Sequence, residues 1–250
     1  MSGHSKWSQI KRQKGAADIK RGAIFSKLTN AIILAAKRGS DPASNFTLKM
    51  AVEKARSADM PKENIERAIK RGAGDEGGAQ IAEVLYEAIG PAGVGIMIEA
   101  ATDNKNRTTA GIKNILSTYG AKLASTGAVA YQFLKMGKLL IEVAGKEKEE
   151  IELQVIDAGA EDFEDLSGEI AVYTKPNELE IVKKALEGQR LAIKEASLSW
   201  EPKSLTQVSD KTDASKILQL MDALENLEEI TAVYANFDIE KGLVNENIGH

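Results

Sequence analysis

The 250-residue chain contains no cysteine. This absence excludes disulfide bridges, thiolate nucleophiles, and zinc or iron–sulfur sites held by cysteine. Histidine is nearly absent too, since His4 and His250 are its only two copies and stand at opposite ends. We expect neither end to be part of a packed site, so Ser-His-Asp and Cys-His triads and histidine metal sites are also excluded. Carboxylate and lysine chemistry remain, and no cofactor or metal is expected.

Long apolar runs are missing as well. The longest, AIILAA at residues 31–36, is far shorter than the ~18 residues that a membrane helix needs. Residues 1–22 lack the apolar stretch of a secretory signal. The first 40 residues are basic, as in a mitochondrial transit peptide, but they are rich in Lys rather than Arg and lead directly into a predicted helix. We therefore expect a cytoplasmic protein that has no membrane partner.

The charge is unevenly distributed. The formal net charge is −4, yet residues 1–72 hold 16 Lys and Arg against 6 Asp and Glu, a net +10. The remaining 178 residues hold 17 and 31, a net −14. Such asymmetry predicts a basic module that meets a polyanion. The acidic remainder would limit non-specific contact with nucleic acid.

The basic part is predicted to be helical. Apolar spacing indicates a helix over residues 22–38, which Gly39 can end. Asp41 and Pro42 are suited to begin a second helix that runs to about Ser57, and Pro61 to begin a third. The short connections predict a small bundle. GAGDEGG, residues 72–78, lacks the Gly-Lys-Ser/Thr of a phosphate loop and is interpreted as a linker.

Beyond the linker the pattern becomes mixed. We expect strands at 84–90, 94–102 and 128–134, a helix over 107–119, and near the end a helix over 213–226 and a strand over 230–239. Between these, residues 137–200 have the order β-α-β-β-α-β of the ferredoxin-like split motif.

The predicted fold class is therefore multidomain α+β: an N-terminal helical bundle and two α+β domains, of which one is ferredoxin-like and the middle one is discontinuous. The helical domain with its linker covers residues 1–78. Residues 79–135 and 203–250 form the discontinuous domain, and residues 136–202 are inserted into it.

A basic arm near the start is the strongest functional signal. SKWSQIKRQKGAADIKRGAIFSKL, residues 5–28, has one acid, Asp18. Its cations are Lys6, Lys11, Arg12, Lys14, Lys20, Arg21 and Lys27. A solvated helix surface is the alternative interpretation, but such surfaces usually mix charges of both signs. Phosphate binding is favoured because like charges repel unless an anion neutralises them. The residues leave DNA and RNA equally open.

Three other patterns are less decisive. TDNKNRT, residues 102–108, is either an ordinary polar helix cap or an anion site in which Lys105 and Arg107 flank a helix N-terminus. EDFED, residues 161–165, is either an Mg²⁺ or acid–base cluster or, as we favour, a solvated strand edge. The aromatic residues lack the pattern of an RNA-recognition domain and are expected to pack in cores or between domains: Tyr131, Phe133, Tyr173, Tyr234 and Phe237.

Several segments together resemble the YebC/PmpR family, which includes a mitochondrial translational activator of cytochrome c oxidase. They are GHSKWSQIKRQKGAADIKRGAIFSKL, MPKENIERAIKRGAG, YEAIGPAGVGIMIEAATDNKNRT and VYANFDI. The resemblance implies three domains around a cleft and a cytoplasmic DNA-binding transcriptional regulator. Some members instead act at the ribosome and ease synthesis of proline-rich stretches.

The resemblance also extends the set of expected nucleic-acid-binding residues. To the seven cations of the arm it adds Trp7, Asn104, Asn106 and Arg107. Lys105 stands where the family often has Arg, so its contact is the weaker match, and Ala92 replaces a frequent Gly.

The sequence thus predicts a regulator without enzymatic activity that binds promoter DNA. A translation factor that binds ribosomal or transfer RNA is the alternative, and an Mg²⁺-dependent phosphate-handling enzyme ranks lower. No small-molecule substrate is evident.

Overall fold

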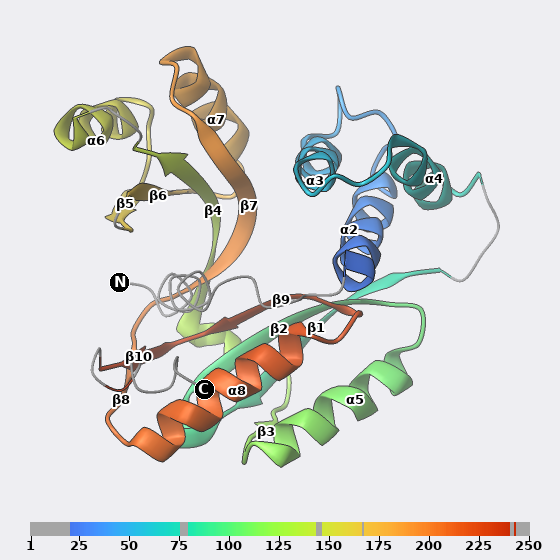
Figure 1. Cartoon of the computed structure of the whole chain (residues 1–250), viewed down its shortest axis with the longest axis vertical. Helices are drawn as coiled ribbons and strands as arrows, with labels where there is room; N and C mark the ends of the chain where they lie inside the picture. Colours follow the sequence, from blue (N-terminus) through green and yellow to red (C-terminus); the bar gives the residue numbers. More distant parts are fainter. Residues whose placement is uncertain (1–20, 76–79, 144–146, 167, 241–242, 244–250) are drawn as a thin grey trace. The chain divides into compact units, whose positions relative to one another are not determined.

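The computed structural model describes residues 21–75, 80–143, 147–166, 168–240 and 243. These residues form seven α-helices, two short 3-10 helices and three sheets, so the predicted α+β class is confirmed (Figure 1). The chain divides into two compact units. The smaller consists of Phe133–Glu201, and the larger contains the residues before and after that segment. The finer division into three domains stays a prediction.

Three helices open the larger unit: α2 (Arg21–Ala36), α3 (Phe46–Ser57) and α4 (Lys62–Ala73). They bury a shared apolar core that includes Ile32 and Leu48. Helix α4 approaches α2 so closely that a Cβ on Gly72 would lie 2.5 Å from the carbonyl oxygen of Ile33. Close contact of these two helices therefore requires glycine at this position.

The predicted start of the second helix at Asp41 is wrong. Helix α3 begins at Phe46 and is capped by Asn45, whose Oδ1 accepts from the Leu48 amide at 3.1 Å. Asp41 instead closes a turn by accepting from the amide of Ala43. Asn45 is the better cap because its side-chain nitrogen also donates to the carbonyls of Ala35 and Gly39, which ties α3 to the end of α2.

A four-stranded sheet with the order β3-β1-β2-β9 follows. Its strands are β1 (Ala82–Ile89), β2 (Gly95–Thr102), β3 (Lys122–Leu123) and β9 (Ile230–Ala235). Strands β1 and β2 pair antiparallel around the short helix η1 (Pro91–Gly93). Ala92 adopts a left-handed φ of 55° there, which explains physically why glycine would suit this position.

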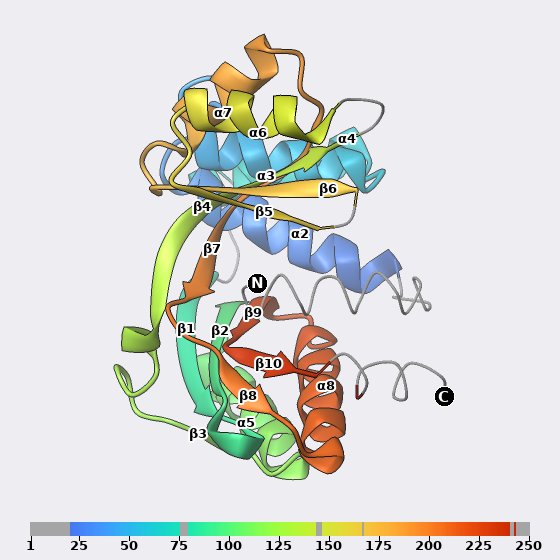
Figure 2. The same ribbon diagram turned by 90° about the vertical axis from the view of Figure 1, so that its left-hand side faces the viewer.

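Helices α5 (Lys105–Thr118) and α8 (Lys211–Glu225) cover one face of this sheet (Figures 1 and 2). Their apolar faces bury Ile112, Leu116 and Leu220 against strand residues such as Ile98. Strands β8 (Thr206–Val208) and β10 (Phe237–Ile239) form a separate parallel pair. The sheet and its two helices thus form the packed body from which the loop after β2 projects.

The predicted strand at residues 128–134 is wrong for residues 128–132, and its last two residues begin strand β4 (Phe133–Glu142). Residues Ala130–Gln132 form the short helix η2, and Tyr131 is 67% exposed instead of packed. The carboxylate of Glu87 prevents strand formation here, because it accepts hydrogen bonds from the backbone amides of Gly127, Val129 and Ala130. In a strand these amides would donate to a neighbouring strand. The four other aromatic residues expected to pack are buried.

The smaller unit has the chain order β4 (Phe133–Glu142), α6 (Lys148–Asp157), β5 (Asp162–Asp165), β6 (Glu169–Thr174), α7 (Leu179–Gly188) and β7 (Ile193–Pro202). Its sheet order is β5-β6-β4-β7. Strands β4 and β6 pair antiparallel, which places Leu139 opposite Val172 and Ile141 opposite Ile170. All four side chains are fully buried and form the core of this unit.

Candidate nucleic-acid interface

Most of the basic arm lies outside the described residues. This holds for Lys6, Trp7, Lys11, Arg12, Lys14 and Lys20, and Arg21 begins α2 without a described side chain. Their role in binding nucleic acid therefore stays a prediction. His4 and His250 are outside the described residues as well.

Lys27 is the one arm cation whose side-chain contacts can be described. Its ammonium group donates a hydrogen bond to the backbone carbonyl of Glu225, the last residue of α8. A cation is favourable at a helix C-terminus, where unpaired carbonyls carry partial negative charge. Lys27 thus fastens α2 to α8, which gives it a structural role beside the predicted contact with phosphate.

The TDNKNRT segment forms the start of α5. Asn104 is the N-cap, and its Oδ1 accepts from the Arg107 amide at 3.1 Å. The Thr102 hydroxyl accepts from the Asn104 amide at 2.9 Å and from the Thr108 hydroxyl at 2.8 Å. Asn104 is consequently occupied as a helix cap. Lys105 and Asn106 are exposed beside it.

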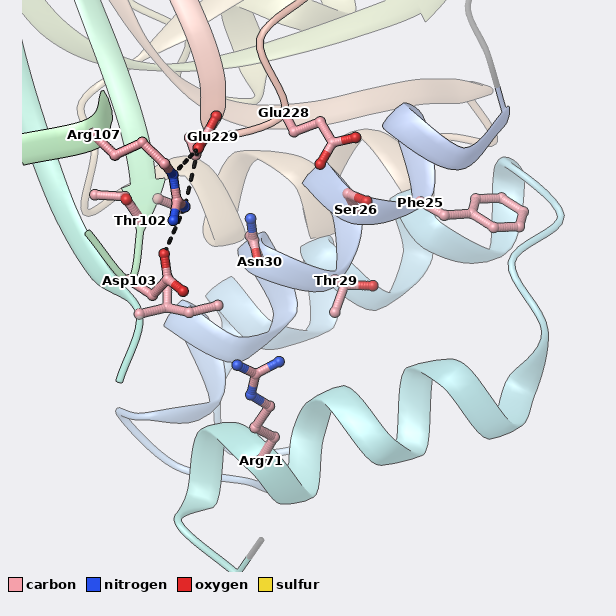
Figure 3. A pocket seen from close by; sticks show the side chains of 12 residues that line it. Phe25, Ser26, Thr29, Asn30, Arg71, Thr102, Asp103, Arg107, Glu228 and Glu229 are labelled. Carbon is pink, nitrogen blue, oxygen red and sulfur yellow. Dashed lines mark hydrogen bonds and ion pairs between the residues drawn. The ribbon is translucent and has the colours of Figure 1, made fainter. Parts of the chain in front are cut away.

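Arg107 is held by two carboxylates. Its guanidinium donates to Asp103 Oδ1 at 2.8 Å and to Glu229 Oε1 at 3.2 Å (Figure 3). The hydrogen bonds to Asp103 and then to Glu229 raise the pKa of Arg107 above its ordinary value. The charge of Arg107 is thereby compensated within the protein. An added anion should therefore be attracted more strongly by Lys105 than by Arg107.

A pocket of about 400 Å³ opens beside Arg107. One wall is formed by Ser26, Thr29 and Asn30 of α2, and the opposite wall by Asp103, Arg107 and Glu229 (Figure 3). Arg71 extends from α4 toward α2 at a third side. The volume falls within the range of about 300–1,000 Å³ that is typical of ligand pockets.

The α2 wall of this pocket was not among the site residues expected from the sequence. Ser26, Thr29 and Asn30 have the spacing i, i+3, i+4 of one helix face. They form a polar stripe on a helix that is mostly apolar, and that stripe is the signal that could have revealed them. Their proximity to Glu229, some 200 positions later, follows only from the packing of α2 near the α8–β9 connection.

The EDFED cluster has partners of its own within the smaller unit. Asp165 accepts from Lys148 at 2.6 Å, Glu164 from the Tyr173 hydroxyl at 3.2 Å, and Glu161 lies 3.7 Å from Lys175. In the described ranges no group of three or more His, Cys, Asp and Glu side chains could hold a metal ion. No helix in these ranges is long and apolar enough to cross a membrane.

Comparison with known proteins identifies the class to which this fold belongs. Residues 5–75 match the model of the TACO1/YebC protein N-terminal domain, and residues 81–237 match that of the TACO1/YebC second and third domain. The chain therefore belongs to the TACO1/YebC family, as its motifs predicted.

Relatives of similar length share about two fifths of the sequence. A "Probable transcriptional regulatory protein" of Halothermothrix orenii is 41% identical over 249 residues, covering 98% of each chain. One of Aquifex aeolicus with the same description is 43% identical over 247 residues, with 98% of each chain covered.

The fold also matches a solved structure. The crystal structure of a conserved hypothetical protein from Aquifex aeolicus aligns with a TM-score of 0.85 at 40% identity, covering 90% of this chain and 93% of that one. Fold and sequence thus agree on the YebC family, whose relatives reported above are named probable transcriptional regulatory proteins.

Proposed function

We propose that the chain is a cytoplasmic, non-enzymatic DNA-binding transcriptional regulator whose basic arm grips the phosphate backbone. The observation that carries this proposal is the arm itself, where seven cations stand against a single acid. A backbone grip of this kind provides affinity and position, while base contacts provide specificity. The names of the relatives support the regulatory role.

We propose three domains for this function. Residues 1–78 would be the basic helical domain, residues 79–135 with 203–250 a discontinuous α+β domain, and residues 136–202 an inserted ferredoxin-like domain. The sheet order β5-β6-β4-β7 supports the last of these. The −14 charge of the part after residue 72 would keep nucleic acid on the basic domain.

Charge reversal in the arm tests the proposal. Lys11→Glu, Lys14→Glu and Arg21→Glu combined should weaken binding to duplex DNA and flatten its salt dependence, because each phosphate contact contributes a slope of about −0.9 in log K against log [salt]. Binding can be measured by fluorescence anisotropy at several salt concentrations.

The matched control reverses three exposed lysines outside the arm: Lys113, Lys122 and Lys216. This variant has the same net charge as the arm variant and should retain more of the affinity and slope. Equal loss in both variants, or no loss in the arm variant, would remove the arm from the mechanism.

A translation factor that binds ribosomal or transfer RNA is the second candidate. One feature of the sequence favours it: no helix carries a row of Asn, Gln or Arg suited to read base edges in a major groove. Crosslinking in cells followed by sequencing of the attached nucleic acid separates the two candidates. Recovery dominated by ribosomal RNA would reject promoter binding.

An Mg²⁺-dependent phosphate-handling enzyme ranks third and rests only on the EDFED cluster. Turnover of a phosphate ester that requires Mg²⁺ and is lost in Asp162→Asn or Asp165→Asn would establish it and contradict a purely binding role.

A further inference from the structure

The pocket beside Arg107 presents a row of polar side chains that have no hydrogen-bond partner among the described residues. Ser26, Thr29 and Asn30 lie on one face of α2 and line this pocket, and each is half-buried. Within the residues that the structure describes, none of these three side chains makes a hydrogen bond to protein. Half-buried amides and hydroxyls lose free energy unless water or a ligand satisfies them.

Asn30 is the group best suited to recognise a ligand. It points into the space between the Arg107 wall and Arg71 (Figure 3). A carboxamide offers a donor and an acceptor side by side. This pair matches the paired acceptor and donor on the edge of a nucleobase, as in asparagine–adenine contacts.

The charges of the pocket argue against a phosphate as the occupant. Three carboxylates line it, those of Asp103, Glu228 and Glu229, against the two guanidiniums of Arg71 and Arg107. Since Arg107 is already bound by two of these carboxylates, the net field disfavours an anion. The part of the ligand that lies inside the pocket should therefore be uncharged.

The remaining walls favour a flat, partly apolar group. Phe25, Ile81 and Ala101 line the pocket beside the polar row; Ile81 and Ala101 are buried, and the half-buried Phe25 provides the exposed apolar surface. A nucleobase has this combination of apolar faces and a hydrogen-bonding edge, and unpaired bases are the parts of single strands that proteins commonly take into pockets.

We propose that this pocket binds one unpaired nucleobase of a single-stranded nucleic acid, with Asn30 hydrogen-bonded to the edge of the base. The proposal rests on the proposed function, because the arm would hold the backbone while the pocket takes a base. It adds a contact that distinguishes single strands from duplexes, in which each base is paired and stacked and cannot enter a pocket.

The test uses the full chain and four homopolymeric RNAs of ~12 nucleotides, within the usual site size for single strands. Asn30→Ala should weaken binding of the preferred RNA by roughly 5- to 150-fold, the range expected for loss of one good base contact. The salt slope should be unchanged, because no phosphate contact is removed. Asn114→Ala, at an exposed position of α5, is the matched control and should bind as the parent does.

An abasic scan makes the test specific. Removing the recognised base from the RNA should weaken binding by a similar factor, and Asn30→Ala should then add no further loss, as expected for two changes that remove one interaction. A photoreactive 4-thiouridine at that position should crosslink to α2. Two results would overturn the proposal. One is equal binding by Asn30→Ala and the parent protein; the other is a loss of affinity in Asn30→Ala that adds to the loss caused by the abasic site.

Failure of this proposal is distinguishable from failure of the proposed function. If duplex DNA binds through the arm while no single strand depends on Asn30, only the base pocket is rejected. If neither duplex nor single strand binds, both proposals are rejected.

Discussion

The ammonium group of Lys27 in α2 donates a hydrogen bond to the carbonyl of Glu225 at the end of α8. The two residues are 198 positions apart in the chain. Ten residues further along the chain, Lys37 of the loop after α2 donates to the carbonyl of Ile81 at 2.5 Å, just before β1 begins. Cations of the helical segment thus have structural partners in the sheet region of the larger unit.

Lys27→Met should therefore lower the free energy of unfolding by about 1–2 kcal/mol, because the α8 terminus loses a partly buried cation that compensates its carbonyls. Urea denaturation measures this change. Lys113→Met, at an exposed site in the middle of α5, should change stability by less than about 0.5 kcal/mol. Equal effects of the two substitutions would contradict the helix contact.

Gly72 sets the approach of α4 to α2. Gly72→Ala should destabilise the protein by about 1–3 kcal/mol through overpacking, because the new Cβ would lie 2.5 Å from the Ile33 carbonyl oxygen and 2.7 Å from the Ala36 Cβ. Gly111→Ala in α5 is the control, since its Cβ would meet only Leu227 at 4.0 Å. That change should be neutral or stabilising by up to about 1 kcal/mol, as alanine favours helix. Thermal unfolding of both variants checks the contrast.

The Glu87 carboxylate holds the loop before η2. It accepts from the amides of Gly127 and Val129 at 2.6 Å each and from Ala130 at 2.8 Å. Burial raises the pKa of Glu87, but the three backbone hydrogen bonds together place it below the ordinary value of 4.5. Glu87→Gln should cost about 1–3 kcal/mol at pH 7, because an amide cannot accept at both positions.

The pH dependence of this effect has a defined sign. A carboxylate whose pKa is lowered on folding contributes its stability above the unfolded pKa, and this contribution is lost as the pH falls through the folded pKa. The difference between the parent protein and Glu87→Gln should therefore be constant above about pH 5 and shrink below about pH 4. Urea titrations across this range measure it, and a gap that widens in acid would contradict the assignment.

Lys105 and Arg107 should differ in their effect on nucleic-acid binding. Lys105→Gln should weaken binding and reduce the magnitude of the salt slope by up to about 1 if the TDNKNRT segment meets phosphate. Arg107→Gln should have a smaller effect, because Asp103 and Glu229 already compensate its charge. Anisotropy titrations of the two variants provide the comparison, and a larger loss for Arg107→Gln would show that nucleic acid displaces the carboxylates.

The sequence by itself determined the α+β class and most element positions, because helix and strand periodicity is local and clearly expressed in segments such as α4 and β1. It also determined the family, since the motifs are contiguous in the chain. It failed where two local signals competed. Asp41 and Asn45 are both good caps, and only the contacts of Asn45 with the end of α2 decide between them.

Only the tertiary structure decided the partners of the candidate site. In the sequence Lys27 is one of several arm cations, and only the fold places the end of α8 beside it. The sequence likewise predicts that Arg107 is available to an anion, whereas in the structure Glu229 lies 3.2 Å away. The Glu87 carboxylate turns an apparent strand into a loop from 40 positions away. These contacts join residues that are distant in the chain. Composition and periodicity are properties of local segments, so they do not indicate which distant side chains come together when the chain packs.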